Sequence, residues 1–313
     1  EIRAKVGFLD LCQRPELATE VTVTAARRLG VDAAILFADI LLILQPLGFD
    51  LEFAKGEGPI IHNPLREATD LQRLRPLATA QPLSHVTDAV TMIRRELEQE
   101  IPLIGFAGAP FTLACYAIEG GGSRHYEHAK AFLFRDPGAF RALMEHLTDA
   151  TIVYLNAQID AGAQAVQVFD SWVGTLAPSD YREAVLPHMT RLFQSLRPEV
   201  PSIHFGTDTS TLLELQRAAG SQVLGVDWRV ELDQAWERIG RDVAIQGNLD
   251  PTVLLGAPAE IHRRAAAILD QAGGRPGHIF NLGHGILPST PVEHVIDLVH
   301  FVHDHHAAPR ATD

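Results

Sequence analysis

Short apolar runs alternate along this chain with longer amphipathic stretches. Each apolar run is too short for a helix and lacks regular alternation of apolar and polar side chains. That pattern is typical of strands buried on both faces of a parallel sheet. The runs occupy residues 33–39, 102–108, 165–170, 202–205, 222–227, 243–247 and 278–283. The sequence therefore predicts seven strands.

Between the runs, apolar side chains recur at helical spacing. Val86, Val90, Ile93 and Leu97 lie on one face of a helix that we expect to stop before Pro102. Similar stripes predict helices over residues 137–162, 178–196 and 295–302. A strand followed by a helix, repeated along the whole chain, predicts a βα architecture with right-handed crossovers.

The expected fold is a single-domain, distorted (β/α)8 TIM-type barrel over residues 1–313. Such a barrel needs eight strands, so one of them is expected to be short, polar or distorted. A doubly wound open sheet is the alternative architecture. Residues 48–61 are predicted to form a hairpin insertion, and residues 304–313 a polar tail.

Charge and composition restrict the partners. The formal net charge of −13 repels phosphate backbones, which argues against nucleic-acid binding. Lysine occurs only at Lys5, Lys55 and Lys130, so 23 of the 26 basic residues are arginines. Coding bias accounts for such an excess, and so does a site for carboxylates, which arginine binds bidentately.

Two cysteines, Cys12 and Cys115, are too few for a disulfide framework or a multi-cysteine metal site. We expect reduced thiols in a cytoplasmic protein. No apolar run is long enough to span a membrane, and no signal peptide is visible. Because the chain starts at Glu1 rather than Met, we expect it to be part of a longer protein.

In a (β/α)8 barrel, chemistry collects at the carboxyl ends of the strands. Polar groups follow every predicted strand here, which predicts a wide pocket, although each one alone is also compatible with a helix cap or a turn. These strand-end residues are Asp39, Thr112, Tyr116, Asp170, Ser171, His204, Asp208, Asp227, Asn248, Asp250, Asn281 and His284.

Three other features of the sequence could indicate a phosphate or metal site. Gly120–Gly122 matches no phosphate-binding motif, so we interpret it as a structural loop over the pocket. His303 and His306 have metal-capable spacing, but a solvated tail is the better interpretation. His204 is followed by Gly206 rather than a cysteine, so no thiolate-histidine zinc site is predicted.

Several of these segments resemble the uroporphyrinogen decarboxylase family, in the family's order and across nearly the whole chain. They are the apolar run around Asp39, the Gly108-Ala109-Pro110-Phe111-Thr112-Leu113 turn with Tyr116 and Glu119-Gly120-Gly121-Gly122-Ser123, the run Gln167-Val168-Phe169-Asp170-Ser171-Trp172-Val173-Gly174, Gln246-Gly247-Asn248-Leu249-Asp250-Pro251, and Asn281-Leu282-Gly283-His284-Gly285.

The resemblance implies a cytoplasmic homodimer that needs no metal and no organic cofactor. It implies stepwise decarboxylation of the four acetate side chains of uroporphyrinogen III to methyl groups, which gives coproporphyrinogen III for haem synthesis. Asp39 is the implied catalytic residue. Asp39, Tyr116, Ser171 and His284 are the implied substrate-site residues, and Phe169 is implied to pack in the same cleft.

One feature of the family is not seen. Its members carry an arginine-rich segment, which binds carboxylates, before the part that matches Glu1–Arg3. The chain as given is therefore expected to be weakly active or inactive. Two alternative functions remain open: a zinc-dependent corrinoid or thiol methyltransferase of the related fold, and a non-catalytic tetrapyrrole-binding protein.

Overall fold

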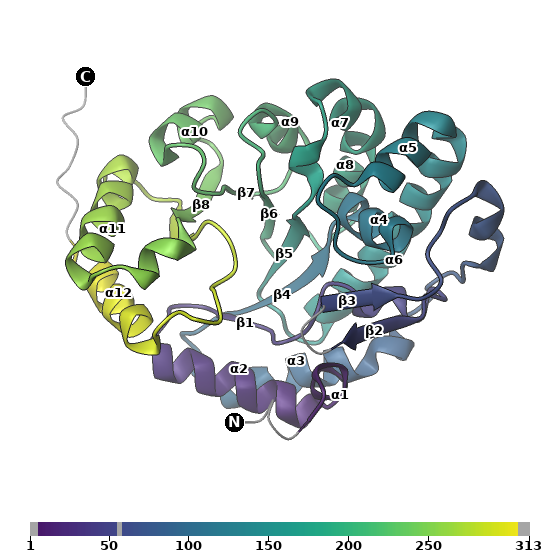
Figure 1. Cartoon of the computed structure of the whole chain (residues 1–313). Helices are drawn as coiled ribbons and strands as arrows, with labels where there is room; N and C mark the ends of the chain where they lie inside the picture. Colours follow the sequence, from purple (N-terminus) through teal and green to yellow (C-terminus); the bar gives the residue numbers. More distant parts are fainter. Residues whose placement is uncertain (1–5, 55–57, 306–313) are drawn as a thin grey trace.

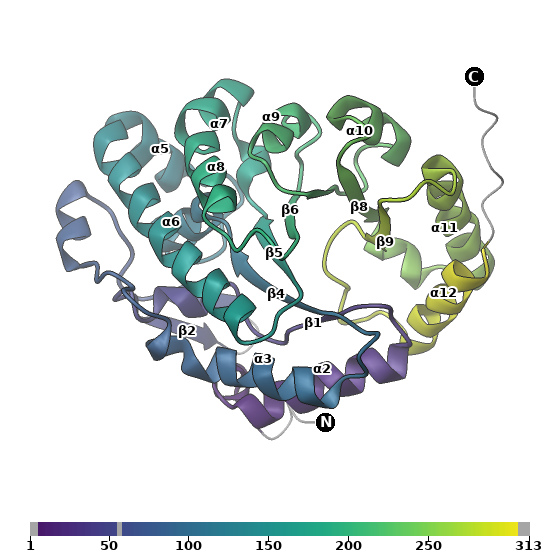
Figure 2. The same ribbon diagram turned by 180° about the vertical axis from the view of Figure 1, so that it is seen from behind.

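Seven parallel strands form a curled sheet in a computed structural model that describes residues 6–54 and 58–305. The strands neighbour one another in chain order, and helices surround the sheet in an arc (Figures 1 and 2). They are β1 (Ala34–Ile35), β4 (Leu103–Gly108), β5 (Ala165–Asp170), β6 (Ser202–Gly206), β7 (Val223–Gly225), β8 (Ala244–Leu249) and β9 (His278–Leu282).

The strand order decides between the two expected architectures. A doubly wound sheet reverses its order at a switch point, whereas this order runs from β1 to β9 without reversal. The predicted barrel-type α/β fold is confirmed, in distorted form. Within the described residues the sheet has seven strands, and no ladder joins β9 to β1. Instead α12 packs against α2, and His303 contacts the Asp32 carboxylate at 3.0 Å.

The helices follow the predicted stripes, with one exception. Residues 178–196 form two helices rather than one, since Val185 leaves helical geometry and Pro187 cannot donate a backbone hydrogen bond. The helices are α1 (Phe8–Cys12), α2 (Pro15–Leu29), α3 (Ser84–Glu96), α4 (Pro110–Glu119), α5 (Glu127–Arg135), α6 (Pro137–Asp160), α7 (Pro178–Ala184), α8 (Leu186–Gln194), α9 (Leu213–Ala218), α10 (Leu232–Ile239), α11 (Pro258–Ala272) and α12 (Val292–Asp304).

The segment predicted as a hairpin holds two antiparallel strands, β2 (Leu51–Ala54) and β3 (Gly58–Ile61). They form a separate two-stranded sheet beside the main one. β3 also holds the glycine-rich segment, because the Ile61 amide donates to the Gly120 carbonyl at 2.8 Å. The hairpin therefore contacts the loop that follows α4. Of the predicted polar tail, residues 306–313 lie outside the described residues.

Strand alternation directs side chains to opposite faces of the sheet. In β5, Val166, Val168 and Asp170 are completely buried on one face, whereas Phe169 lies on the other. Phe169 pairs in register with Gly108 of β4 and Phe205 of β6. The sheet thus has a helix-covered outer face and an inner face that carries aromatic rings.

Candidate active site

A row of rings crosses the inner face of the sheet. Phe169 makes edge contacts with Phe106 of β4 at 5.5 Å and with Phe205 of β6 at 5.9 Å between ring centroids. His284 then stacks on Phe205 at 6.4 Å. Offset and edge-to-face pairs of this kind hold aromatic rings in defined orientations. The row lines the inner face with rings from β4 to the loop after β9.

Asp39 lies just beyond β1 and is half-buried. Its Oδ1 accepts the Leu41 backbone amide at 2.8 Å, and within the described residues no basic side chain pairs with it. This hydrogen bond lowers the pKa of the carboxyl, but desolvation by burial has the larger, opposite effect. The pKa of Asp39 is therefore raised to about 6. Asp39 is therefore a carboxylate whose negative charge is poorly compensated.

Tyr116, on α4, shares the environment of Asp39. Burial, followed by the negative charge of Asp39, raises the pKa of the Tyr116 phenol to about 12. The hydroxyl therefore keeps its proton. The Tyr116 ring contacts Trp172 at 5.9 Å, which links it to the turn after β5. Two residues 77 positions apart in the sequence are thus brought into one electrostatic environment.

Ser171 and His284 line a cavity of about 230 Å³ at the carboxyl ends of the strands. The cavity is bounded by the glycine-rich loop and by the loops that follow β5, β6, β7 and β9. Its other lining residues are Ser123, Arg124, Tyr126, Trp172, Gly174, Thr175, Thr207, Asp208, Trp228 and Arg229. The loop at Gly120–Gly122 therefore leads into the wall of this cavity, which carries several hydroxyl groups and two guanidinium groups.

The His284 imidazole favours its neutral form. Partial desolvation lowers its pKa first, and the positive charge of Arg229 lowers it further, against the opposing effect of Asp227. One side of the ring is exposed to the cavity, while the other stacks on Phe205. A bound anion would reverse this balance, since a negative charge stabilises imidazolium.

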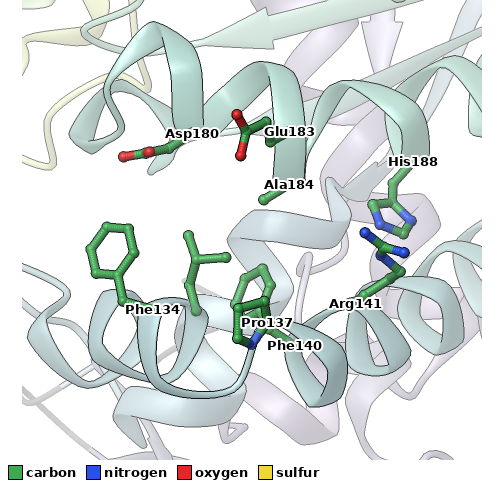
Figure 3. A pocket seen from close by; sticks show the side chains of 9 residues that line it. Phe134, Pro137, Phe140, Arg141, Asp180, Glu183, Ala184 and His188 are labelled. Atoms are coloured by element: carbon green, nitrogen blue, oxygen red, sulfur yellow. The ribbon is translucent and has the colours of Figure 1, made fainter.

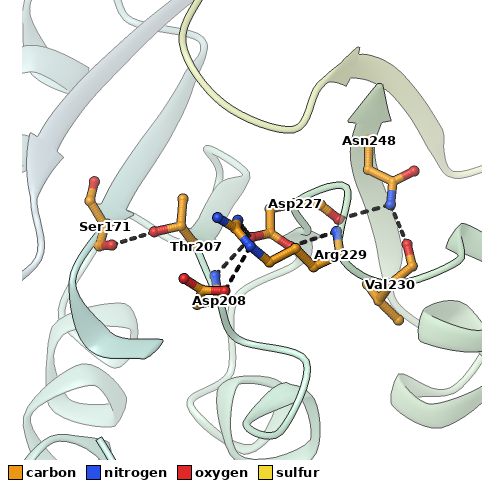
Figure 4. Close-up of polar contacts among 7 residues, drawn as sticks. All are labelled: Ser171, Thr207, Asp208, Asp227, Arg229, Val230 and Asn248. Atoms are coloured by element: carbon orange, nitrogen blue, oxygen red, sulfur yellow. Dashed lines mark hydrogen bonds and ion pairs between the residues drawn. The ribbon is translucent and has the colours of Figure 1, made fainter. Parts of the chain in front are cut away.

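Hydrogen bonds connect the loops after β5 to β7 and strand β8 (Figure 4). Thr207 donates to the Ser171 carbonyl, and the Asp208 amide donates to Asp227 Oδ2 at 2.7 Å. Asn248 Nδ2 donates to the Asp227 carbonyl at 2.9 Å and to the Val230 carbonyl. We call Ser171, Thr207, Asp208, Asp227, Arg229, Val230 and Asn248 the strand-end network. It fixes the cavity wall from four successive strands.

Arg229 lies at the centre of this network. Its Nη1 contacts the buried Asp227 carboxylate at 2.5 Å, its Nε contacts Asp208 at 2.8 Å, and its guanidinium lies over the Trp228 ring at 4.2 Å. Asp227 and Asp208 are among the polar residues expected at the strand ends, whereas Arg229 and Arg124 are not. Arg229 follows a strand-end motif and Arg124 follows the glycine-rich segment, but the sequence does not show which carboxylates lie near them.

Asp170 and His204, two of the strand-end residues, face away from the cavity. They lie 3.4 Å apart, completely buried, and Asp170 also accepts from Thr112 of α4. The Thr112 hydroxyl accepts the Trp172 amide, so this cluster supports the turn that carries Ser171. Of the proposed site residues, Ser171 and His284 line the cavity, whereas Asp39, Tyr116 and Phe169 are not among its lining residues. Tyr116 is linked to the cavity through Trp172, and Asp170 and His204 lie behind the sheet.

A second cavity of about 230 Å³ lies on the outside, between α5 and α6 on one side and α7 and α8 on the other (Figure 3). It combines exposed Phe134 with Asp180, Glu183 and His188. None of the residues proposed from the sequence lines it. Because chemistry in this fold belongs to the strand ends, the inner cavity is the candidate active site.

Within residues 6–54 and 58–305, no group of three or more histidine, cysteine or acidic side chains is arranged to hold a metal ion. In the same part of the chain, no helix is both long enough and apolar enough to cross a membrane. Cys12 and Cys115 are both buried and form no disulfide bond with each other.

Solved structures of other proteins share the fold of this chain. A methyltransferase from Methanosarcina mazei superimposes with a TM-score of 0.77 at 20% identity, covering 95% of this chain and 90% of that one. A putative vitamin-B12-independent methionine synthase from Listeria monocytogenes gives 0.62 at 11% identity, covering 93% and 86%. At these identities the likeness concerns the fold alone.

Sequence comparison is more specific. Residues 1–305 match the family model described as uroporphyrinogen decarboxylase (URO-D). A uroporphyrinogen decarboxylase of Sorangium cellulosum is 55% identical over 306 residues, covering 96% of this chain and 87% of the relative. One of Carboxydothermus hydrogenoformans is 52% identical over 305 residues, covering 97% and 87%. The chain therefore belongs to the uroporphyrinogen decarboxylase family.

Proposed function

We propose that this protein is a uroporphyrinogen decarboxylase, which converts the four acetate side chains of uroporphyrinogen III to methyl groups and yields coproporphyrinogen III. The observation that carries the proposal is the identity of 50–55% to relatives named for this activity, over nearly the whole chain. The inner cavity supports it with chemistry suited to a carboxylated, cation-forming substrate.

The reaction needs an electron sink, because loss of CO₂ leaves an electron pair on the acetate methylene carbon. Protonation of the neighbouring pyrrole ring carbon creates an iminium-like cation. The pair from the broken C–C bond then forms an exocyclic double bond, which neutralises that cation. Protonation of the methylene and loss of the added ring proton restore the pyrrole with a methyl group. The substrate thereby supplies its own sink, as organic cofactors do in other decarboxylases.

Asp39 is proposed as the catalytic residue of this step. Its carboxylate, poorly compensated by protein groups, would face the pyrrole N–H groups, accept their hydrogen bonds and stabilise the positive charge that develops on the ring. A pKa of about 6 leaves most of the carboxylate ionised at neutral pH. A charge that protein partners do not already neutralise acts more strongly on a cationic transition state.

The remaining side chains are proposed to bind substrate. The Tyr116 phenol stays protonated and can donate to a carboxylate, as can the Ser171 hydroxyl. His284 becomes a cationic partner only when a bound carboxylate stabilises its imidazolium form. Phe169 is proposed to pack against the macrocycle, since its ring lies in the aromatic row between Phe106 and Phe205.

The test is anaerobic incubation of the full-length gene product with uroporphyrinogen III, followed by oxidation and chromatography of the porphyrins. We expect intermediates that carry progressively fewer carboxylates to precede coproporphyrin. Binding of the substrate without any product would instead support the non-catalytic tetrapyrrole-binding alternative. Stoichiometric zinc in active protein would favour the methyltransferase alternative.

The resemblance also implies a homodimer in the cytoplasm, and both belong to this proposal. Light scattering during size-exclusion chromatography tests the dimer, for which we expect twice the mass of the chain. A monomer at all concentrations would contradict it.

A further inference from the structure

The two arginines that line the inner cavity differ in whether protein carboxylates already pair with them. Arg229 is held by the carboxylates of Asp208 and Asp227 and by the face of Trp228. Arg124 is exposed, and in the part of the chain that the structure describes its guanidinium makes no ion pair or side-chain hydrogen bond. One arginine is therefore a structural member of the cavity wall, and the other is available to a ligand.

The charges around the cavity support this distinction. Two carboxylates offset the single positive charge of Arg229, so that group contributes little net attraction for an anion. The His284 imidazole favours its neutral form. Arg124 is thus the cation of the described cavity lining whose charge is uncompensated. The chain as a whole carries −13, which makes a local, uncompensated cation necessary for any polyanionic ligand.

The backbone beneath Arg124 is anchored at both ends. On one side, Ile60 and Gly121 form a β-bridge next to the hydrogen bond from Ile61 to Gly120. On the other side, the Tyr126 amide donates to the Ser123 hydroxyl at 3.0 Å, and the Tyr126 ring lies 5.2 Å from Trp172. The anchored loop therefore holds the Arg124 side chain beside the cavity wall formed by Trp172.

Hydroxyl groups complete a carboxylate-binding arrangement. Ser123, Ser171, Thr175 and Thr207 line the same cavity as Arg124. The Thr175 and Thr207 hydroxyls already donate to the Trp172 and Ser171 carbonyls, so the Ser123 and Ser171 hydroxyls are the ones that can donate to a ligand. A carboxylate accepts up to about four hydrogen bonds, and a guanidinium with these two hydroxyls supplies donors of the right kind. The cavity volume, about 230 Å³, suits a side chain of a tetrapyrrole rather than the macrocycle itself.

We propose that Arg124, with the Ser123 and Ser171 hydroxyls, forms a subsite for one side-chain carboxylate of the tetrapyrrole, while Arg229 maintains the wall and binds no substrate charge. This inference rests on the proposed function. It assigns a binding residue outside the group Asp39, Tyr116, Ser171 and His284. The carboxylate belongs to either an acetate or a propionate, and two ligands distinguish these sources.

The experiment measures equilibrium binding of two stable oxidised porphyrins by fluorescence. Uroporphyrin carries acetates and propionates, whereas coproporphyrin retains only the propionates. The proteins are the wild type, R124Q, R124K and R135Q. Arg135 is a matched control, because it is exposed on α5 and, among the described residues, hydrogen-bonds within its own helix, to the Ala131 carbonyl at 3.2 Å.

We expect R124Q to weaken uroporphyrin binding about three- to tenfold, as for loss of one partly solvated charge-assisted contact. R124K should retain most of the affinity, and R135Q should match the wild type. Weaker coproporphyrin binding by R124Q would assign the subsite to a propionate, and a loss confined to uroporphyrin would assign it to an acetate. In turnover, R124Q should raise KM more than it lowers kcat.

Unchanged affinity of R124Q for both porphyrins overturns the inference while wild-type turnover leaves the proposed function intact. An equal loss in R135Q also overturns it, since a general charge effect would then explain the result. A wild-type protein that neither binds uroporphyrin nor decarboxylates uroporphyrinogen overturns both proposals, so the two failures are distinguishable.

Discussion

Asp39 and Asp227 are both aspartates that follow a strand at the same end of the sheet, yet their environments are opposite. Asp227 is 2% exposed and receives the Arg229 guanidinium and two backbone amides. Asp39 keeps some exposure and receives one amide, with desolvation raising its pKa to about 6. A neutralised carboxylate stabilises structure, whereas an uncompensated one retains its field for a ligand.

Removal of the Asp39 charge should have the largest effect. We expect Asp39→Asn, and likewise Asp39→Ala, to reduce kcat/KM at least about a thousandfold, which corresponds to roughly 4 kcal/mol of lost transition-state stabilisation. The fold should remain, as judged by circular dichroism. Asp32→Asn, at an exposed aspartate that contacts His303, is the control. Retained activity of Asp39→Asn would refute the catalytic role.

The equivalent change at Asp227 should act mainly on stability. Asp227→Asn removes the buried negative charge that pairs with Arg229 and accepts the Asp208 amide. We expect the free energy of unfolding to fall by about 2 to 3 kcal/mol, because removal of one partner of a buried ion pair is costly. Asp208→Asn, at the exposed partner of the same arginine, should cost less than about 1 kcal/mol. Thermal unfolding measures both. Equal losses would show that burial of Asp227 is not decisive.

The two aspartates should also differ in how pH affects stability. A raised carboxyl pKa means that the folded state binds the proton more tightly than the unfolded state. Asp39 therefore makes the protein less stable as pH rises from about 4 through about 6. The full effect is up to about 3 kcal/mol.

Asp39→Asn removes this cost. We expect the variant to be more stable than the wild type above about pH 6 and equally stable near pH 4, measured as Tm across that range. A variant that is less stable than the wild type at pH 8 would contradict the inference that the Asp39 charge is uncompensated in the folded protein.

A smaller effect should follow from the glycines that flank His284. A Cβ at Gly283 would lie 2.7 Å from the Trp228 amide nitrogen, so Gly283→Ala must displace the loop next to Asp227. A Cβ at Gly285 would meet nothing within 4 Å. We expect Gly283→Ala to cost about 1 to 2 kcal/mol and to raise KM a few-fold, with Gly285→Ala close to wild type. Identical behaviour of the two variants would exclude this steric explanation.

Much of the fold could be predicted, because seven short apolar runs separated by helical stripes leave few packing solutions. The proposed site residues also came from motifs that stand at strand ends. Arg124 and Arg229 could not be found in this way. Their significance depends on which carboxylates lie nearby, and Asp208 and Asp227 meet Arg229 only because two loops fold together.

The sequence by itself determined the barrel-type α/β fold, the family and the set of polar residues that follow the strands. Tertiary structure decided which of those residues share a cavity and what charge each one retains. Asp170 and Ser171 are adjacent, yet one is buried behind the sheet and the other lines the cavity. The physical reason is that burial and ion pairing depend on neighbours distant in the chain, and these interactions set how much of a side chain's charge remains for a substrate.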